Sequence, residues 1–225
     1  MSMHLQEAAE RRRKGSGLVR ALPRSSTYAE GPKRALDVTL VLMIAPAALL
    51  LIAVLALLVC FSGRPFYVQE RLGRGGRTYR MWKLRSMVAD ADARLARHLE
   101  INPAAQAEWG RTQKLRDDPR VTRLGRLLRK TSLDELPQLW NVLKGDMSLV
   151  GPRPMMPHQR ALYPGAAYFR LRPGITGPWQ VSARNASSFA DRARFDAQYE
   201  RDLSLRTDLG LLVATARVVV KGTGC

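Results

Sequence analysis

Residues 38–61 read VTLVLMIAPAALLLIAVLALLVCF, an apolar run without a charged residue. A run of this length and composition is long enough to cross a lipid bilayer. Pro46 lies inside the run, and a proline in the interior of a helix kinks or breaks that helix. The sequence therefore predicts a membrane helix that is interrupted at Pro46.

Both flanks of the run are basic. The basic residues before it are RRRK (11–14), Arg20, Arg24, Lys33 and Arg34, and those after it are Arg64, Arg71, Arg74, Arg77, Arg80, Lys83 and Arg85. Positive charge near a membrane segment favours the cytoplasmic side, so we expect both ends there. A re-entrant hairpin over residues 31–62, which enters and leaves by one face, satisfies both flanks. A straight span and a buried core helix remain as alternatives.

The excess of basic residues limits which classes of binding partner are compatible with the chain. The chain has 225 residues, with 37 Lys and Arg against 19 Asp and Glu, and a formal net charge of +18. Such an excess points to an anionic partner: a nucleic acid, an acidic membrane surface or a phosphorylated substrate. Residues 1–30 are polar and Arg-rich and predict a disordered basic tail, which leaves residues 63–225 as the main domain. The isolated Cys60 and Cys225 indicate a reducing compartment.

The main domain reads as an α-rich α+β fold. Residues 63–85 alternate enough for a short β-hairpin, with GRGG (73–76) at its turn, and a helical pattern follows from 86 to 109. Leu124, Leu127 and Leu128 recur at helical spacing among basic residues, which suits either an interfacial membrane helix or a helix packed on a core. A second helix is expected in 131–143 and an apolar one in 208–220, with loops at 144–157 and 171–179.

The stretch TSLDELPQLW (131–140) holds two adjacent acids, Asp134 and Glu135, in a chain poor in acids. The pattern Ser132-x-x-Glu135 is that of a capping box, in which each side chain bonds the backbone N–H of the other. A helix start also favours a bound anion. The stretch by itself therefore leaves a helix cap and a catalytic pair open.

Three segments occur in order behind the apolar run: KLRSM (83–87), RKTSLDELPQLWNVLKGDMSLVGPRP (129–154) and RPGITGPWQVSARN (172–185). Together they strongly resemble the bacterial sugar transferases called monotopic phosphoglycosyl transferases, or polyprenyl-phosphate hexose-1-phosphate transferases. The resemblance covers about residues 31–225. KGTG (221–224) looks most like the group that starts exopolysaccharide synthesis with galactose or glucose phosphate.

The resemblance implies a reaction and its participants. Such enzymes move a hexose-1-phosphate from a UDP-sugar to undecaprenyl phosphate and release UMP, at the cytoplasmic face of the bacterial inner membrane. It implies that Asp134 is the nucleophile, which forms a covalent phosphosugar intermediate, and that Glu135 is its partner. The same two carboxylates are the implied ligands of Mg²⁺, with Mn²⁺ as a substitute.

An anionic nucleophile that attacks an anionic diphosphate needs nearby cations, which Mg²⁺ and basic side chains supply. The matching motifs contain five candidate substrate-binding or phosphate-binding residues: Lys83, Arg85, Arg129, Arg153 and Gln180. The commoner family form GLWQVSGRN reads GPWQVSARN here, with Pro178 and Ala183, in a stretch expected to touch the nucleotide or the sugar.

Two other classes of protein are alternatives to a sugar transferase. A nucleic-acid-binding protein would fit the charge, but no recognisable binding module occurs in the sequence, and we expect no nucleic acid as partner. A non-catalytic membrane scaffold is the other alternative, and it predicts no Mg²⁺-dependent release of nucleoside monophosphate from a sugar nucleotide.

Overall fold

The computed structural model describes residues 27–61, 63–113, 115–182 and 187–220. Most of the predicted tail, the C-terminal KGTG and Ala183 lie outside these ranges, and the last four residues of the predicted tail form a helical turn, α2 (Thr27–Glu30). The described part is rich in helix, and its few short strands form two two-stranded sheets. The predicted α-rich character is therefore confirmed.

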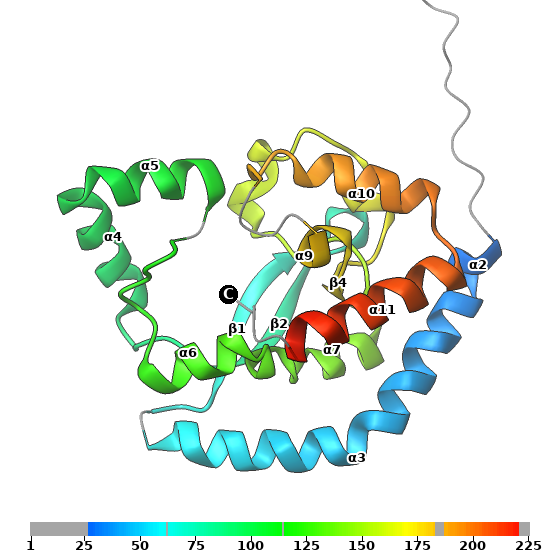
Figure 1. Ribbon diagram of the computed structural model, residues 1–225, viewed down its shortest axis with the longest axis horizontal. Coiled ribbons are helices and arrows are strands. Elements are labelled where there is room, and N and C mark those ends of the chain that lie inside the picture. Colours follow the sequence, from blue (N-terminus) through cyan, green and yellow to red (C-terminus); the bar gives the residue numbers. More distant parts are fainter. Residues whose placement is uncertain (1–26, 62, 114, 183–186, 221–225) are drawn as a thin grey trace, which may run out of the picture.

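The apolar run forms one long helix, α3 (Pro32–Cys60), which bends sharply about midway along its length (Figure 1). Pro46 lies inside α3, and its missing N–H and its clash with the preceding turn account for such a bend. The interruption is thus a kink in a continuous helix. With 29 residues and an 18-residue stretch of mean hydropathy 3.0, α3 is long and apolar enough to cross a membrane. Many of its large apolar side chains are exposed, as Met43 and Leu50 show at 73% and 71%.

The first arm of α3 is attached to the folded body by polar contacts. Lys33 Nζ lies 2.6 Å from Asp208 Oδ2, and Asp37 Oδ1 accepts a hydrogen bond from Leu149 N at 3.0 Å. Arg34 donates to the carbonyls at the end of α7 (Gln138–Lys144). Lys33 and Arg34 belong to the basic flank of the apolar run, and they also attach α3 to the folded body.

The second arm of α3 is attached by apolar packing. Leu55 and Val59 form a buried cluster with Leu84 of β2 (Thr78–Leu84) and Leu128 of α6 (Arg123–Lys130). Both ends of α3 therefore rest on the same folded body, as Figure 1 shows.

The predicted β-hairpin is confirmed. Strand β1 (Phe66–Leu72) pairs with β2 in antiparallel register from Phe66–Leu84 to Leu72–Thr78. The turn contains a short 3-10 helix, η1 (Arg74–Gly76), in which Gly75 has a φ of 71° and Gly76 a φ of 76°. These left-handed conformations explain Gly75 and Gly76, because other residues adopt them at a cost.

The helix expected from 86 to 109 is two helices, α4 (Ala91–Ile101) and α5 (Pro103–Thr112). Asn102 separates them, and its side chain accepts a hydrogen bond from Ala105 N at 3.0 Å. Asn-Pro ends one helix and starts the next, because the residue before a proline avoids helical angles and Asn is a favourable N-cap. The two helices lie to one side of the body (Figure 1).

The two expected loops contain strands. Strands β3 (Ser148–Val150) and β4 (Gly174–Thr176) form a small parallel sheet that joins the second and third motifs. A side chain at Gly174 would meet Gly151 N at 2.1 Å, so glycine is required for the two backbones to approach so closely. The remaining elements are η3 (Pro157–Leu162), α8 (Ala167–Arg170), α9 (Pro178–Ser182), α10 (Arg192–Arg201) and the predicted apolar helix α11 (Leu205–Val220).

Candidate active site

A pocket of about 270 Å³ lies where the second and third motifs meet the C-terminal helix. Its lining comes from α6, from the segment between α6 and α7, from α7, from the segment after β3, from β4, from α9 and from α11. The residues are Arg129, Thr131, Ser132, Leu133, Asp134, Glu135, Leu136, Leu139, Arg153, Ile175, Thr176, Trp179, Gln180, Thr215 and Val219. Pockets for whole ligands usually measure about 300–1,000 Å³. The volume therefore suits the reacting part of a ligand.

Asp134 and Glu135 lie in η2 (Leu133–Glu135), a 3-10 turn between α6 and α7. Asp134 is only 5% exposed. Lys83 Nζ, on β2, lies 2.6 Å from Glu135 Oε1 and 3.9 Å from Asp134 Oδ2. The β-hairpin thus brings one ammonium to both carboxylates of the pair.

The predicted capping box is wrong. Ser132 has a φ of 57° and its side chain makes no capping bond, while the carboxylate of Glu135 binds Lys83. An N-cap bond contributes about 1 kcal/mol, whereas leaving one partner of a buried ion pair alone costs about 3–5 kcal/mol. The ion pair therefore decides where the side chain of Glu135 points.

The two carboxyls of the pair have opposite pKa shifts. Burial raises the pKa of Asp134 above its usual range, against the attraction of Lys83, and the neighbouring Glu135 raises it further. Burial alone would also raise the pKa of Glu135, but Lys83 and then Arg153 outweigh it and hold that pKa at about 2. Glu135 is therefore ionised at neutral pH, whereas burial destabilises the ionised form of Asp134.

Two of the predicted phosphate-binding arginines line the pocket. Arg129, on α6, donates from Nε to Ser86 Oγ at 2.9 Å, which fixes the guanidinium beside the motif KLRSM. Arg153 follows β3, and its guanidinium lies 5.7 Å from the ring centre of Trp179. Both cations flank Asp134, as an anionic ligand requires.

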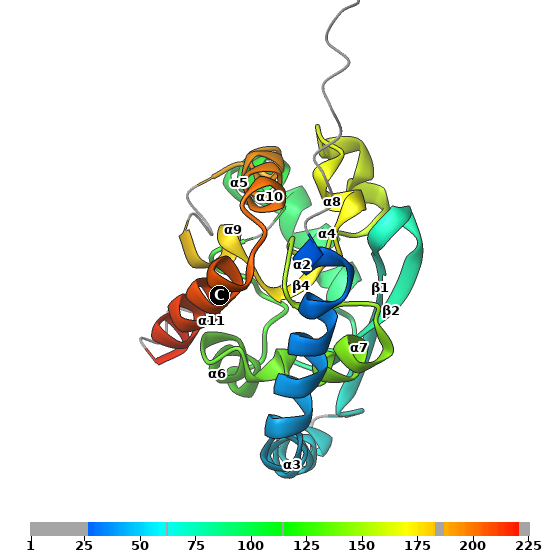
Figure 2. The ribbon, with the colours of Figure 1, turned by 90° about the vertical axis from the view of Figure 1, so that its right-hand side faces the viewer.

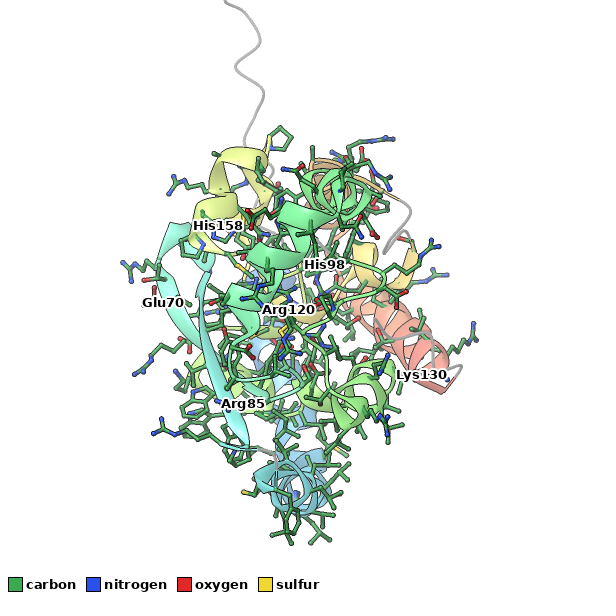
Figure 3. The ribbon with its side chains drawn as sticks, turned by 90° about the vertical axis from the view of Figure 1, so that its left-hand side faces the viewer. Glu70, Arg85, His98, Arg120, Lys130 and His158 are labelled. Atoms are coloured by element: carbon green, nitrogen blue, oxygen red, sulfur yellow. The ribbon has the colours of Figure 1, made fainter. Side chains whose placement is uncertain are left out.

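Arg85 is not brought to the pocket. It directly follows β2 at the end of the hairpin near α3 (Figure 3), and its guanidinium lies beside Gly63, where an added side-chain carbon would meet it at 3.2 Å. Because side chains alternate along a strand, Lys83 and Arg85 share a face only if the strand continues. It ends at Leu84.

Gln180 and Trp179 are buried on α9 and line the pocket. The unusual Pro178 is the first residue of this helix, a position where proline is well tolerated. Trp179 belongs to the third motif and lines the pocket, but it is not among the candidate residues predicted from the sequence. The Trp179 Nε1 donates to Ser187 Oγ at 2.8 Å.

Two arginines outside the predicted set lie behind the pocket. Arg192, on α10, is 6% exposed, and its guanidinium lies 4.3 Å from the ring centres of Trp179 and Phe189. Burial, with repulsion from Arg153, lowers the pKa of Arg192 to about 9. Burial, again with repulsion from Arg153, lowers the pKa of Arg71 to about 10. Buried cations that repel one another favour a bound anion nearby. A motif search misses them because both lie outside the three motifs.

Asp196 provides a pH test of this region. It is 3% exposed, accepts from Tyr163 Oη at 2.8 Å, and burial raises its pKa to about 7. Because the folded pKa lies above the unfolded value near 4, the folded state keeps its proton longer, and stability falls as pH rises from about 4 through 7. Between pH 5 and pH 8 this loss is on the order of 3 kcal/mol, and we expect Asp196→Asn to remove most of it in thermal unfolding curves at these two pH values. A variant that keeps the wild-type pH dependence would contradict the assignment.

The donor set fits Mg²⁺ only together with a substrate. Among the described residues, no group of three or more His, Cys, Asp or Glu side chains comes together, and the labelled His98 and His158 lie apart (Figure 3). Mg²⁺ needs only one or two protein carboxylates when substrate phosphates and waters complete its shell. The adjacent Asp134 and Glu135 meet that requirement.

The described fold combines this site with one helix that is long and apolar enough to cross a membrane. The model of the family described as "Bacterial sugar transferase" matches residues 28–222. The chain therefore belongs to the bacterial sugar transferase family.

The relatives carry names from glycan synthesis. The exopolysaccharide production protein ExoY of Sinorhizobium fredii is 44% identical over 85% of this chain and 87% of its own length. The UDP-galactose-lipid carrier transferase of Erwinia amylovora is 48% identical over 72% of this chain, and the undecaprenyl-phosphate galactose phosphotransferase of Salmonella typhimurium is 44% identical over 85% of it. The matched regions span only 35% and 41% of these two proteins.

Proposed function

We propose that this protein transfers a hexose-1-phosphate, with galactose or glucose as the sugar, from a UDP-sugar to undecaprenyl phosphate and so starts exopolysaccharide synthesis. The observation that carries this proposal is the buried Asp134 in a pocket that also presents Arg129 and Arg153, with Lys83 Nζ 3.9 Å from Asp134 Oδ2. A carboxylate surrounded by cations suits attack on a diphosphate, because the cations neutralise the charge that would otherwise repel it.

The reaction proceeds in two displacements. An Asp134 carboxylate oxygen attacks the phosphorus that carries the sugar, and the bond from that phosphorus to the bridging oxygen breaks, so that UMP leaves with the electron pair. An oxygen of the lipid phosphate then attacks the same phosphorus, and the bond to Asp134 breaks. The carboxylate is regenerated, and the product is a lipid-linked diphosphate sugar.

The chain's own residues divide the work. Lys83 holds Glu135 ionised and stands 3.9 Å from Asp134, which lowers the cost of the ionised nucleophile. Arg129 and Arg153 are placed to contact the phosphate oxygens, and Arg suits such bidentate contacts. Mg²⁺, or Mn²⁺ in its place, held by Asp134 and Glu135, would supply further charge neutralisation.

The exposed surface supports a re-entrant membrane attachment at the cytoplasmic face of the inner membrane. A straight helix of the 29 residues of α3 would be about 44 Å long, which is longer than the thickness of the hydrocarbon core of a bilayer, about 30 Å. A helix that crossed would place its two ends on opposite faces, whereas Asp37 and Val59 both contact the same body. On α6, Leu127 is 57% exposed beside exposed Arg123, Arg126 and Lys130, as an interfacial helix on an anionic surface requires.

Cysteine labelling tests the topology. Ala35 and Arg64 are exposed on the two sides of the apolar segment. In a Cys60→Ser, Cys225→Ser background, we expect Ala35→Cys and Arg64→Cys both to react with a membrane-impermeant maleimide in inside-out vesicles and neither to react in right-side-out vesicles. Labelling from opposite sides would establish a straight span instead.

The activity is tested with purified protein, undecaprenyl phosphate and a panel of UDP-sugars. We expect UMP release that depends on Mg²⁺, with UDP-galactose or UDP-glucose as the preferred donor. A non-catalytic scaffold would release no UMP with any donor.

A further inference from the structure

The lining of the pocket contains chemically different sets of side chains. One set is charged and contains Asp134 and the cations Arg129 and Arg153. Another set is aliphatic, and Leu136, Leu139, Ile175 and Val219, each of them half-buried, belong to it. We propose that this second group, the aliphatic wall, receives the first isoprenoid units of the lipid acceptor. The inference rests on the proposed function and adds where the acceptor chain lies.

The chemistry of the aliphatic wall excludes the other parts of the substrates. Sugar hydroxyls and a nucleobase need hydrogen-bonding partners or aromatic faces, which the four aliphatic side chains do not offer. The two threonines nearby are already engaged: Thr176 and Thr215 join their hydroxyls at 2.6 Å, and Thr215 donates to Leu211 O at 2.7 Å. A hydrocarbon chain, by contrast, gains about 0.8 kcal/mol for each methylene removed from water.

The aliphatic wall is continuous with both arms of α3. Leu136 packs against the cluster that contains Leu55 and Val59 of the second arm. Leu139 and Ile175 pack against the cluster that contains Val41 of the first arm. A chain that leaves Asp134 along this wall therefore stays on apolar surface until it reaches the segment proposed to lie in the bilayer.

Helix α11 contributes Val219 to the aliphatic wall. Its Val219 lines the pocket together with Arg129 of α6, and Figures 1 and 2 show the C-terminal end of α11 beside α6. The hydrogen bond between Thr176 and Thr215 ties α11 to β4. The C-terminal helix thus forms part of a lipid subsite rather than only a surface near the bilayer.

Two threonine variants test the assignment. Val219→Thr keeps side-chain shape and Ile175→Thr shortens the side chain by one carbon, and both place a hydroxyl where the chain would lie. We expect each to raise the KM for undecaprenyl phosphate about tenfold while the KM for the UDP-sugar changes less than twofold. Val213→Thr is the matched control, because Val213 lies on the same helix at 53% exposure and outside the pocket lining. It should match the wild type.

A short acceptor distinguishes binding at the aliphatic wall from binding along α3. Geranyl phosphate reaches only the first units, so the same tenfold penalty is expected with it. An unchanged KM for both acceptors in both variants would overturn the proposal, as would a penalty confined to the long acceptor.

Equilibrium binding keeps the test independent of turnover. We expect the wild type in detergent to bind geranyl phosphate more tightly than methyl phosphate, and Val219→Thr and Ile175→Thr to lose most of that difference. Equal affinity for the two phosphates in the wild type would overturn the lipid subsite. Failure of the proposed function would show differently, as absent UMP release by a wild type that still prefers geranyl phosphate.

Discussion

Replacing Asp134 by asparagine is expected to lower the rate of sugar-phosphate transfer by roughly 10⁴-fold or more, because an amide is not a nucleophile and loss of a covalent nucleophile costs about this much. Radiolabelled donor should leave no phosphosugar on the variant, whereas the wild type without acceptor should retain label. The measurements are UMP release and retained label after denaturation. Undiminished turnover would refute the assignment of the nucleophile.

The stability of the same variant distinguishes lost chemistry from lost folding. Burial raises the pKa of Asp134 in the folded state, so ionisation of Asp134 reduces stability as pH rises through that raised value. Asp134→Asn removes this cost, and we expect a Tm at pH 8 equal to or above that of the wild type. Asp117→Asn, at an exposed position, is the control that should change neither rate nor Tm.

Replacing Lys83 by glutamine is expected to lower kcat by roughly 10²–10³-fold, a loss typical for one preorganised electrostatic group. Lys83 is the strongest opponent of burial at both carboxyls. Without it the pKa of Asp134 rises, so the acid limb of the pH–rate profile should move to higher pH. The measurement is kcat and kcat/KM across pH 5 to 9.

Two comparison variants interpret the Lys83 result. Lys83→Arg keeps the charge and should retain more activity than Lys83→Gln, with the acid limb near its wild-type position. Lys144→Gln breaks a more exposed ion pair, Lys144–Asp146 at 2.6 Å, and should cost no more than about 1 kcal/mol of stability. An acid limb that does not move in Lys83→Gln would show that Lys83 does not set the protonation of the nucleophile.

Local patterns in the sequence predicted several elements correctly. The apolar run predicted a long apolar helix, Pro46 predicted an interruption that the structure shows as a kink, and the alternation with GRGG predicted the β-hairpin. Both depend on residues close together in the chain, where side-chain period and backbone restrictions act directly. The limits of this reasoning appear at Asn102, where a cap and a proline divide one expected helix into two.

The candidate site was predicted in part. The structure brings Lys83, Arg129, Arg153 and Gln180 to Asp134 and Glu135, but it leaves Arg85 beside Gly63. The motifs contain all of these residues, but sequence alone does not tell that β2 ends between Lys83 and Arg85. Arg192 and Val219 lie outside the motifs, and only packing places them at the pocket.

The sequence by itself determined the family motifs, the bent apolar helix and the acidic pair, because these are written in short stretches of chain. The tertiary structure alone decided the role of that pair. Lys83 and Glu135 are 52 positions apart, and their ion pair outweighs the capping bond that the local sequence favoured, because separating buried charges costs more than losing one cap. The structure likewise decided that both arms of α3 meet one body, since long-range packing follows from how distant elements fit together.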